Sequence, residues 1–107
     1  MPQFVIFYLG GNQPSSPEER KQHFSEYMQW IASLGDAAVS SMNPLKNKNT
    51  VNSDRSVTRG GTTTMSGYTI IEAESMESAL ASAKACPFLD IGGSLEVSEL
   101  VVMSGQK

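Results

Sequence analysis

The chain has 107 residues, of which 39% are hydrophobic and 18% are charged, and its formal net charge at pH 7 is −3. This balance predicts one globular domain over residues 1–107, with its core within residues 3–103 and a short polar C-terminal tail, and it excludes a disordered chain. A negative chain has no overall attraction to nucleic acid or to an anionic membrane, so we expect neither as a partner.

The first predicted elements are a strand and a helix. Residues 4–9 form an apolar run without alternation, which is typical of a central strand covered on both faces. The sequence Ser-Pro-Glu-Glu at 16–19 has the pattern of a helix start, with a capping serine, a proline in the first helical position and a glutamate at the third. Apolar residues then recur at helical spacing until Leu34, and Gly35 is placed to end the helix.

The middle of the chain predicts strands and a hairpin. Residues 37–42 favour a short strand, and the polar run 43–49 favours a loop. Strand character returns at residues 50–58, and Arg-Gly-Gly-Thr at 59–62 predicts a hairpin turn. Residues 68–73 form the next predicted strand.

The last predicted elements are a helix and a strand. Ser75 is placed to cap a helix that ends before Pro87, and residues 94–103 contain the last predicted strand. The resulting order, β-α-β-β-α-β, predicts an α+β, ferredoxin-like fold with a four-stranded antiparallel sheet.

Two helices on one face of such a sheet leave its other face bare. The apolar side chains expected on that face predict a homodimer in which the two sheets face each other. The alternative is a monomer whose second sheet face is partly wetted.

Cellular location is predicted from what the chain lacks. No apolar run reaches the roughly 20 residues of a membrane-spanning helix, and the N-terminus lacks the pattern of a secretory signal. The single cysteine, Cys86, cannot form an intramolecular disulfide, which agrees with a reducing compartment. We therefore expect a cytoplasmic protein.

Several segments together resemble the YCII-related proteins, including the branch named for its DGPF motif. They are the first strand, Ser-Pro-Glu-Glu-Arg at 16–20, Asn-Pro-Leu at 43–45, residues 66–73, Ala-Cys-Pro at 85–87 and residues 92–97. The resemblance implies a dimeric α+β barrel. No Asp-Gly-Pro-Phe stands within residues 58–65, where that branch carries its motif.

The resemblance also implies a histidine–aspartate pair. The histidine position, on the first helix, matches His23, whereas Cys86 stands at the aspartate position before Pro87. Asp90 is the nearest substitute in sequence for the carboxylate that would orient the imidazole. A related dehydrochlorinase of chlorinated hydroxyquinols, and muconolactone isomerases and small monooxygenases of the same superfamily, imply an aromatic or quinone-like ligand by analogy.

The predicted ligand pocket lies between the first helix and the sheet. His23, Tyr27 and Trp30 form a row at helical spacing, which predicts either a pocket wall or interface packing. Four of the eight basic residues fall within residues 46–59, which predicts either attraction of an anionic ligand or a solvated edge. The predicted pocket residues are Tyr8, Tyr27, Trp30, Arg55, Arg59 and Tyr68.

Other site chemistry is not indicated. One histidine and one cysteine do not form a recognisable metal site, and the Gly-Gly pairs lack the context of nucleotide-binding loops, so we expect no metal and no cofactor. Cys86 is expected to be buried and structural. Two hypotheses follow: a small organic ligand is bound with His23 as candidate acid or base, or the protein is a non-catalytic dimeric sensing or accessory module with a structural His23.

Overall fold

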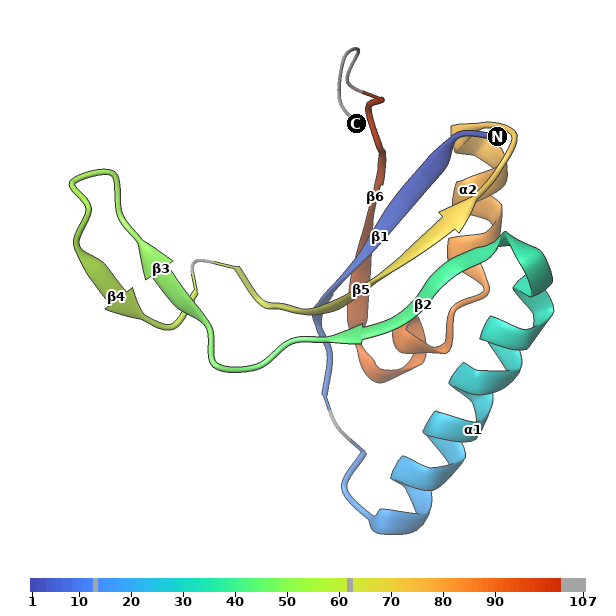
Figure 1. The fold of residues 1–107 in the computed structure, drawn as a ribbon. Coiled ribbons are helices and arrows are strands. Elements are labelled where there is room, and N and C mark those ends of the chain that lie inside the picture. Colours follow the sequence, from blue (N-terminus) through green and yellow to red (C-terminus); the bar gives the residue numbers. More distant parts are fainter. Residues whose placement is uncertain (13, 62, 103–107) are drawn as a thin grey trace.

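The computed structural model describes residues 1–12, 14–61 and 63–102, and it confirms the predicted α+β fold (Figure 1). A four-stranded antiparallel sheet has the order β2-β5-β1-β6. Its strands are β1 (Gln3–Gly10), β2 (Ala38–Pro44), β5 (Met65–Glu72) and β6 (Gly93–Glu99). The helices are α1 (Pro17–Leu34), α2 (Met76–Lys84) and the short 3-10 helices η1 (Gly35–Ala37) and η2 (Pro87–Ile91), and a separate two-stranded sheet contains β3 (Asn49–Val51) and β4 (Val57–Arg59).

Local sequence determines where the two long helices begin and where the first one ends. The Ser16 hydroxyl accepts the Glu19 N–H at 3.0 Å, and Ser75 accepts the Ser78 N–H at 3.2 Å, so each helix has the predicted serine cap. Gly35 has φ +56, a conformation that a side chain disfavours, and it ends α1 as predicted. Among the described residues, no helix is long and apolar enough to cross a bilayer.

The core lies between the helices and one face of the sheet. Alternate residues of β1, namely Phe4, Ile6 and Tyr8, point into it and pack with Trp30 and with the small alanines of α2. The Trp30 indole N–H donates to the Ser82 carbonyl at 2.9 Å, which fastens α1 to α2. The buried residues of α2, Ala79 and Ala83, are small, so the helix can lie close to the sheet.

The other face of the central strands is also apolar. Val5 pairs with Ile70 and Phe7 pairs with Tyr68 across β1 and β5, on the side away from the helices. No helix of the described residues covers this face (Figure 1). Within one chain, β1 is thus covered by helices on one side only.

The prediction of a hairpin turn at residues 59–62 is wrong for residues 59–61, which the structure describes. The turn lies instead at residues 52–56, between β3 and β4, because the Asn52 amide donates to Ser56 and Thr58 and ties the two strands together. Gly60, at φ +94, begins the return to the main sheet, and Thr62 lies outside the described residues.

Two strand ends also differ from prediction. Strand β2 continues to Pro44, beyond the predicted end at residue 42, because the Asn43 amide donates to the Tyr68 carbonyl and keeps the edge paired. Strand β6 ends at Glu99, so Leu100 to Val102 follow it as an exposed apolar segment. Met103 and the predicted polar tail lie outside the described residues.

Candidate functional site

A pocket of about 230 Å³ opens between α1, the sheet and η2; we call it the α1 pocket. Its walls are mostly apolar, and His23, Tyr8 and Tyr27 bring polar atoms to it. The apolar walls include Phe24, Met42, Phe88 and Ile91. Apolar walls with few converging polar groups are typical of small-molecule sites.

Helix geometry places the two polar residues that α1 contributes. His23 and Tyr27 are four residues apart, so they occupy the same face of α1 one turn from each other. Tyr8 reaches the pocket from β1 in the sheet below. The polar groups therefore come from two rigid elements.

Three hydroxyl groups meet at the inner end of the pocket. The Tyr8 hydroxyl lies 2.7 Å from the Tyr27 hydroxyl and 2.5 Å from Thr69 Oγ1. Thr69 donates to the Ser41 carbonyl at 2.8 Å, and Tyr27 is 3.1 Å from the same oxygen. With Thr69 donating to Ser41, Tyr8 can donate to Thr69, and one of the tyrosine oxygens keeps a free lone pair.

Burial controls the ionisation of Tyr8. Desolvation raises the pKa of Tyr8 far above its ordinary range, and the hydrogen bond with Thr69 only partly opposes this. Tyr8 is 7% exposed. At neutral pH it is therefore a neutral phenol that donates and accepts hydrogen bonds.

The Phe88 ring forms another wall of the α1 pocket. It packs against Tyr8 with the ring centroids 5.2 Å apart. A Cβ added to Gly93 would stand 2.1 Å from Phe88 Cε2, so the ring occupies space that only a glycine leaves open. Gly93 thus has a packing role against Phe88.

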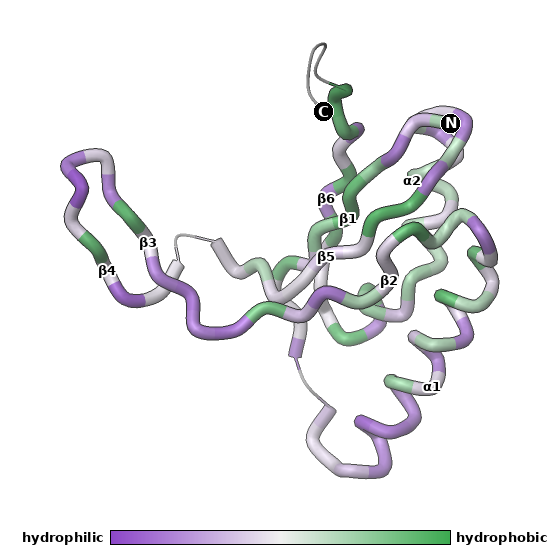
Figure 2. The backbone as a smooth tube through the Cα atoms, in the orientation of Figure 1, coloured by the Kyte–Doolittle hydropathy of each residue, from purple (hydrophilic) through white to green (hydrophobic). Residues whose placement is uncertain are grey.

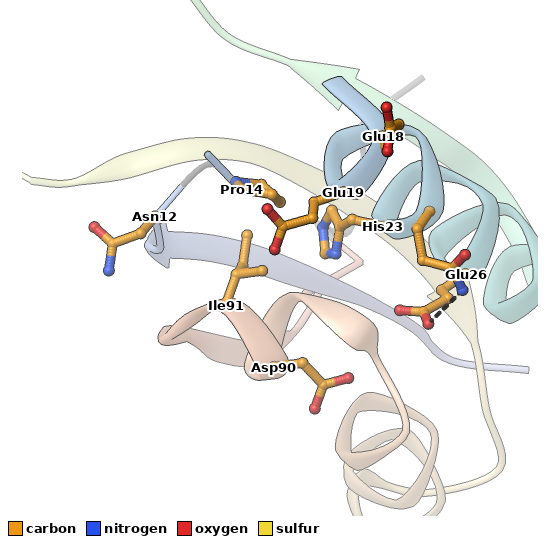
Figure 3. A pocket seen from close by; sticks show the side chains of 9 residues that line it. Asn12, Pro14, Glu18, Glu19, His23, Glu26, Asp90 and Ile91 are labelled. Atoms are coloured by element: carbon orange, nitrogen blue, oxygen red, sulfur yellow. Dashed lines mark hydrogen bonds between the residues drawn. The ribbon is translucent and has the colours of Figure 1, made fainter. Parts of the chain in front are cut away.

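His23 also borders an open cleft between α1 and η2. Carboxylates line this cleft from α1 and from η2 (Figure 3). They are Glu18, Glu19, Glu26 and Asp90. Half-buried His23 thus stands between the α1 pocket and an acidic rim.

No hydrogen bond joins His23 to a carboxylate within the part of the chain that the structure describes. Asp90 lies on η2 across the cleft, and its carboxylate points away from the imidazole (Figure 3). Glu19, one turn before His23, accepts hydrogen bonds from Ser15 and Ser16 at 3.2 and 3.0 Å. Glu26 accepts one from Gln22 at 3.1 Å.

Cys86 occupies the N-cap position of η2 and is buried, with 2% exposed. Burial raises the pKa of its thiol to about 11, so the thiol stays protonated at neutral pH. The side chain belongs to the core together with Trp30 and Ala83. Its placement agrees with the structural role expected from the sequence.

The remaining predicted pocket residues lie elsewhere. Trp30 is in the core with its N–H satisfied by Ser82. Tyr68 is on the helix-free face of β5, because its neighbour Thr69 faces the helices. Arg55 and Arg59 belong to the β3–β4 hairpin, and neither of them lines the α1 pocket.

Two residues that shape the α1 pocket were not predicted from the sequence. Thr69 is fully buried, and its strand position shows only that it alternates with Tyr68. Phe88 follows Pro87 in a 3-10 helix, where no periodic pattern identifies a pocket wall. Among residues 1–12, 14–61 and 63–102, no group of three or more histidine, cysteine or acidic side chains is placed to hold a metal ion.

Comparison with known proteins shows a similarity in fold. No family model matches the chain, and no curated protein matches it in sequence. A solved structure is similar: 5-chloro-2-hydroxyhydroquinone dehydrochlorinase (TftG) from Burkholderia phenoliruptrix AC1100, in complex with 2,5-dihydroxybenzoquinone. The TM-score is 0.60 at 18% sequence identity, and the match covers 98% of this chain and 99% of the other. The two chains share a ferredoxin-like α+β fold.

Proposed function

We propose that this protein binds a small aromatic or quinone-like molecule in the α1 pocket, with His23 as a candidate catalytic acid or base. The observation that carries the proposal is the convergence of His23, Tyr8 and Tyr27 on one mostly apolar cavity. A volume of about 230 Å³ is below the roughly 300–1,000 Å³ of sites for drug-sized ligands, which favours a single-ring molecule.

Each part of the pocket suits one part of such a ligand. The flat rings of Phe24 and Phe88 offer stacking surfaces, and the free lone pair of the tyrosine cluster accepts a ligand hydroxyl. His23, one helical turn from Tyr27, is placed to exchange a proton with a ligand oxygen or ring carbon. The ligand bound to TftG, a dihydroxylated quinone, belongs to this chemical class.

Membership of the YCII-related family, DGPF branch included, is part of this proposal. Support comes from the shared fold of TftG and from the motif segments along the chain. The same applies to a cytoplasmic location and to a homodimer formed through the helix-free face. The paired apolar residues of β1 and β5 support the homodimer, because a bare apolar sheet face usually marks an interface.

A second candidate function is a ligand-sensing or accessory module without catalysis. It is favoured by the lack, among the described residues, of a carboxylate hydrogen-bonded to His23. Cys86 at the position where the resemblance implies an aspartate points the same way. Binding without turnover would distinguish this module from an enzyme.

The proposal is tested by titrating the protein with 2,5-dihydroxybenzoquinone and following binding by calorimetry. We expect saturable binding that Tyr27→Phe weakens by about fivefold, since one hydrogen bond contributes roughly 1 kcal/mol. Tyr68→Phe is the matched control, because it removes the same hydroxyl from the opposite face of the sheet. Absence of binding, or loss of binding in Tyr68→Phe alone, contradicts a site in the α1 pocket.

Catalysis is tested separately with a chlorinated hydroxyquinol by measuring chloride release. We expect His23→Ala to abolish any turnover while leaving the oligomeric state unchanged. Loss of the folded oligomer in this variant would show that His23 is architectural. Equal turnover in the variant and the parent protein would remove the residue from the mechanism.

A further inference from the structure

Residues 45–61, which we call the arm, leave the domain as a projecting hairpin. The arm contains β3 and β4. Among the described residues these strands pair only with each other, and they extend away from the helices and the main sheet (Figure 1). The Cα radius of gyration is 15.6 Å, against roughly 13 Å for a compact chain of this length. The arm therefore makes little use of the core of its own chain.

The tip of the arm is nonetheless highly organised. The Asn52 amide donates to Ser56 and Thr58 across the turn, and Asp54 accepts the Ser56 N–H and hydroxyl at 2.9 and 2.6 Å. An isolated two-stranded hairpin is only marginally stable in water. A preorganised hairpin without a core of its own is suited to contact another surface, because less entropy is lost on docking.

The arm carries an exposed apolar pair. Val51 and Val57 are directly opposite in the β3–β4 register and are 72% and 66% exposed. Figure 2 shows one hydrophobic band on each strand of an otherwise largely hydrophilic hairpin. Paired valines on neighbouring strands form a small contact surface that water covers in the single chain.

Charge identifies the kind of surface that fits the arm. The arm holds four basic residues and one acidic residue, a net charge of +3, whereas the rest of the chain holds four basic and ten acidic residues, a net charge of −6. Two arms repel each other, but an arm attracts the body of another copy. The chain is thus complementary to itself, as a symmetric pair requires.

We propose that the arm packs against the acidic body of a second copy of this chain, with Val51 and Val57 as its apolar contact. The inference rests on the proposed homodimer but concerns a different element from the helix-free sheet face. In a two-fold pair each copy gives one arm and receives one, so every effect of an arm substitution counts twice.

The test is the dimerisation constant of the full chain, measured by analytical ultracentrifugation. We expect the double variant Val51→Ser, Val57→Ser to weaken dimerisation at least tenfold. The matched control is Val101→Ser, Val102→Ser, which changes two valines that are 77% and 93% exposed outside the arm. Equal effects of the two variants, or no effect of the arm variant, would overturn the proposal.

Charge reversal gives a second readout. We expect the double variant Arg55→Glu, Arg59→Glu to dimerise more weakly than the parent protein. We also expect added salt to weaken dimerisation more in the parent protein than in the variant, because salt screens an attraction that the variant lacks. The same salt dependence in the variant and the parent protein would contradict a contact between the arm and the acidic body.

A spin label locates the contact directly. Native Cys86 is buried, so a label on Val57→Cys reacts at one exposed site. We expect the label to be immobile at concentrations where the protein is dimeric and mobile on dilution. A label that is mobile throughout, in a protein that still dimerises, overturns the arm contact and leaves the sheet-face dimer standing. A protein that stays monomeric overturns both, whereas binding of 2,5-dihydroxybenzoquinone tests the α1 pocket independently.

Discussion

Thr69 shows how one buried hydroxyl organises the floor of the α1 pocket. It is fully buried, lies within hydrogen-bond distance of two tyrosine hydroxyls, and donates to the Ser41 carbonyl, which joins β5 to β2. A buried polar group of this kind is costly when its partner is removed, because the group left behind has lost its contact with water. The residue therefore contributes to stability and to pocket shape together.

We expect Thr69→Val to lower the free energy of unfolding by roughly 1–3 kcal/mol, since the substitution conserves volume but leaves buried partners unsatisfied. Urea denaturation measures the change. Thr64→Val, at an exposed position, is the control and should stay within about 0.5 kcal/mol of the parent protein. A neutral Thr69→Val would mean that the tyrosine cluster re-forms without it.

Cys86 predicts a pH dependence. Its pKa rises from 9.0 to about 11 in the folded chain, because burial disfavours the thiolate. The unfolded chain loses the proton first, so the stabilisation is complete below pH 9 and is lost as pH rises toward 11. We expect the free energy of unfolding to fall over this window, and Cys86→Ala to flatten the slope between pH 9 and 10.

The control is the same comparison between pH 7 and 8. There the thiol stays protonated in the folded and the unfolded chain, so the free energy of unfolding should change with pH equally in Cys86→Ala and in the parent protein. Above pH 10, Tyr8 adds to the loss, because burial raises its pKa as well. An identical slope in Cys86→Ala between pH 9 and 10 would show that other groups cause the dependence.

At the scale of elements, η2 and the start of β6 form one packed unit. Phe88 lies over Gly93 so closely that a methyl group there would overlap the ring at 2.1 Å. The same ring contacts Tyr8 and lines the α1 pocket. The position of η2 against β6 thus decides the shape of the pocket.

We expect Gly93→Ala to displace Phe88, lower the melting temperature and weaken binding of 2,5-dihydroxybenzoquinone. Overpacking of this kind typically costs about 1–3 kcal/mol. Gly61→Ala is the control, because the atom nearest to its added Cβ is the flexible Lys48 Cδ at 3.0 Å. Melting curves that coincide for Gly93→Ala and the parent protein would show that the ring moves at no cost.

At the scale of the whole molecule, two surfaces are candidates for the interface of the proposed homodimer: the helix-free sheet face and the arm. Ile70 and its partner Val5 lie at the centre of the first surface. The arm extends beyond the sheet and carries the opposite charge from the body. Together they make the proposed homodimer a property of the entire chain.

We expect Ile70→Glu to convert the dimer into a folded monomer, because a charge on the helix-free face must be desolvated in the dimer but stays hydrated in the single chain. Light scattering gives the mass, and circular dichroism checks the fold. Ala81→Glu, which adds the same charge on exposed α2, should remain dimeric. An unaltered mass for Ile70→Glu would place the interface elsewhere.

The sequence by itself determined the order of elements, because caps and periodicity are local. Ser16 and Gly35 bound α1 as predicted, Ser75 begins α2, and the run at residues 4–9 lies within β1. His23, Tyr8 and Tyr27 were also predicted to share a pocket, since helical spacing and strand position depend on neighbours in sequence. The shift of the hairpin turn to residues 52–56 was missed, because Asn52 acts there through its side chain.

Only the tertiary structure decided which candidates meet. Thr69 and Phe88 join Tyr8 through contacts between β1, β5 and η2, which are distant in sequence and follow from packing. Trp30, which was predicted to lie in one row with His23 and Tyr27, donates its N–H to α2 instead. Arg55 and Arg59 belong to the arm and lie outside the α1 pocket. Periodicity assigns a residue to one face of its own helix or strand. Which other element packs against that face depends on contacts between segments distant in sequence, and these form only when the whole core packs together.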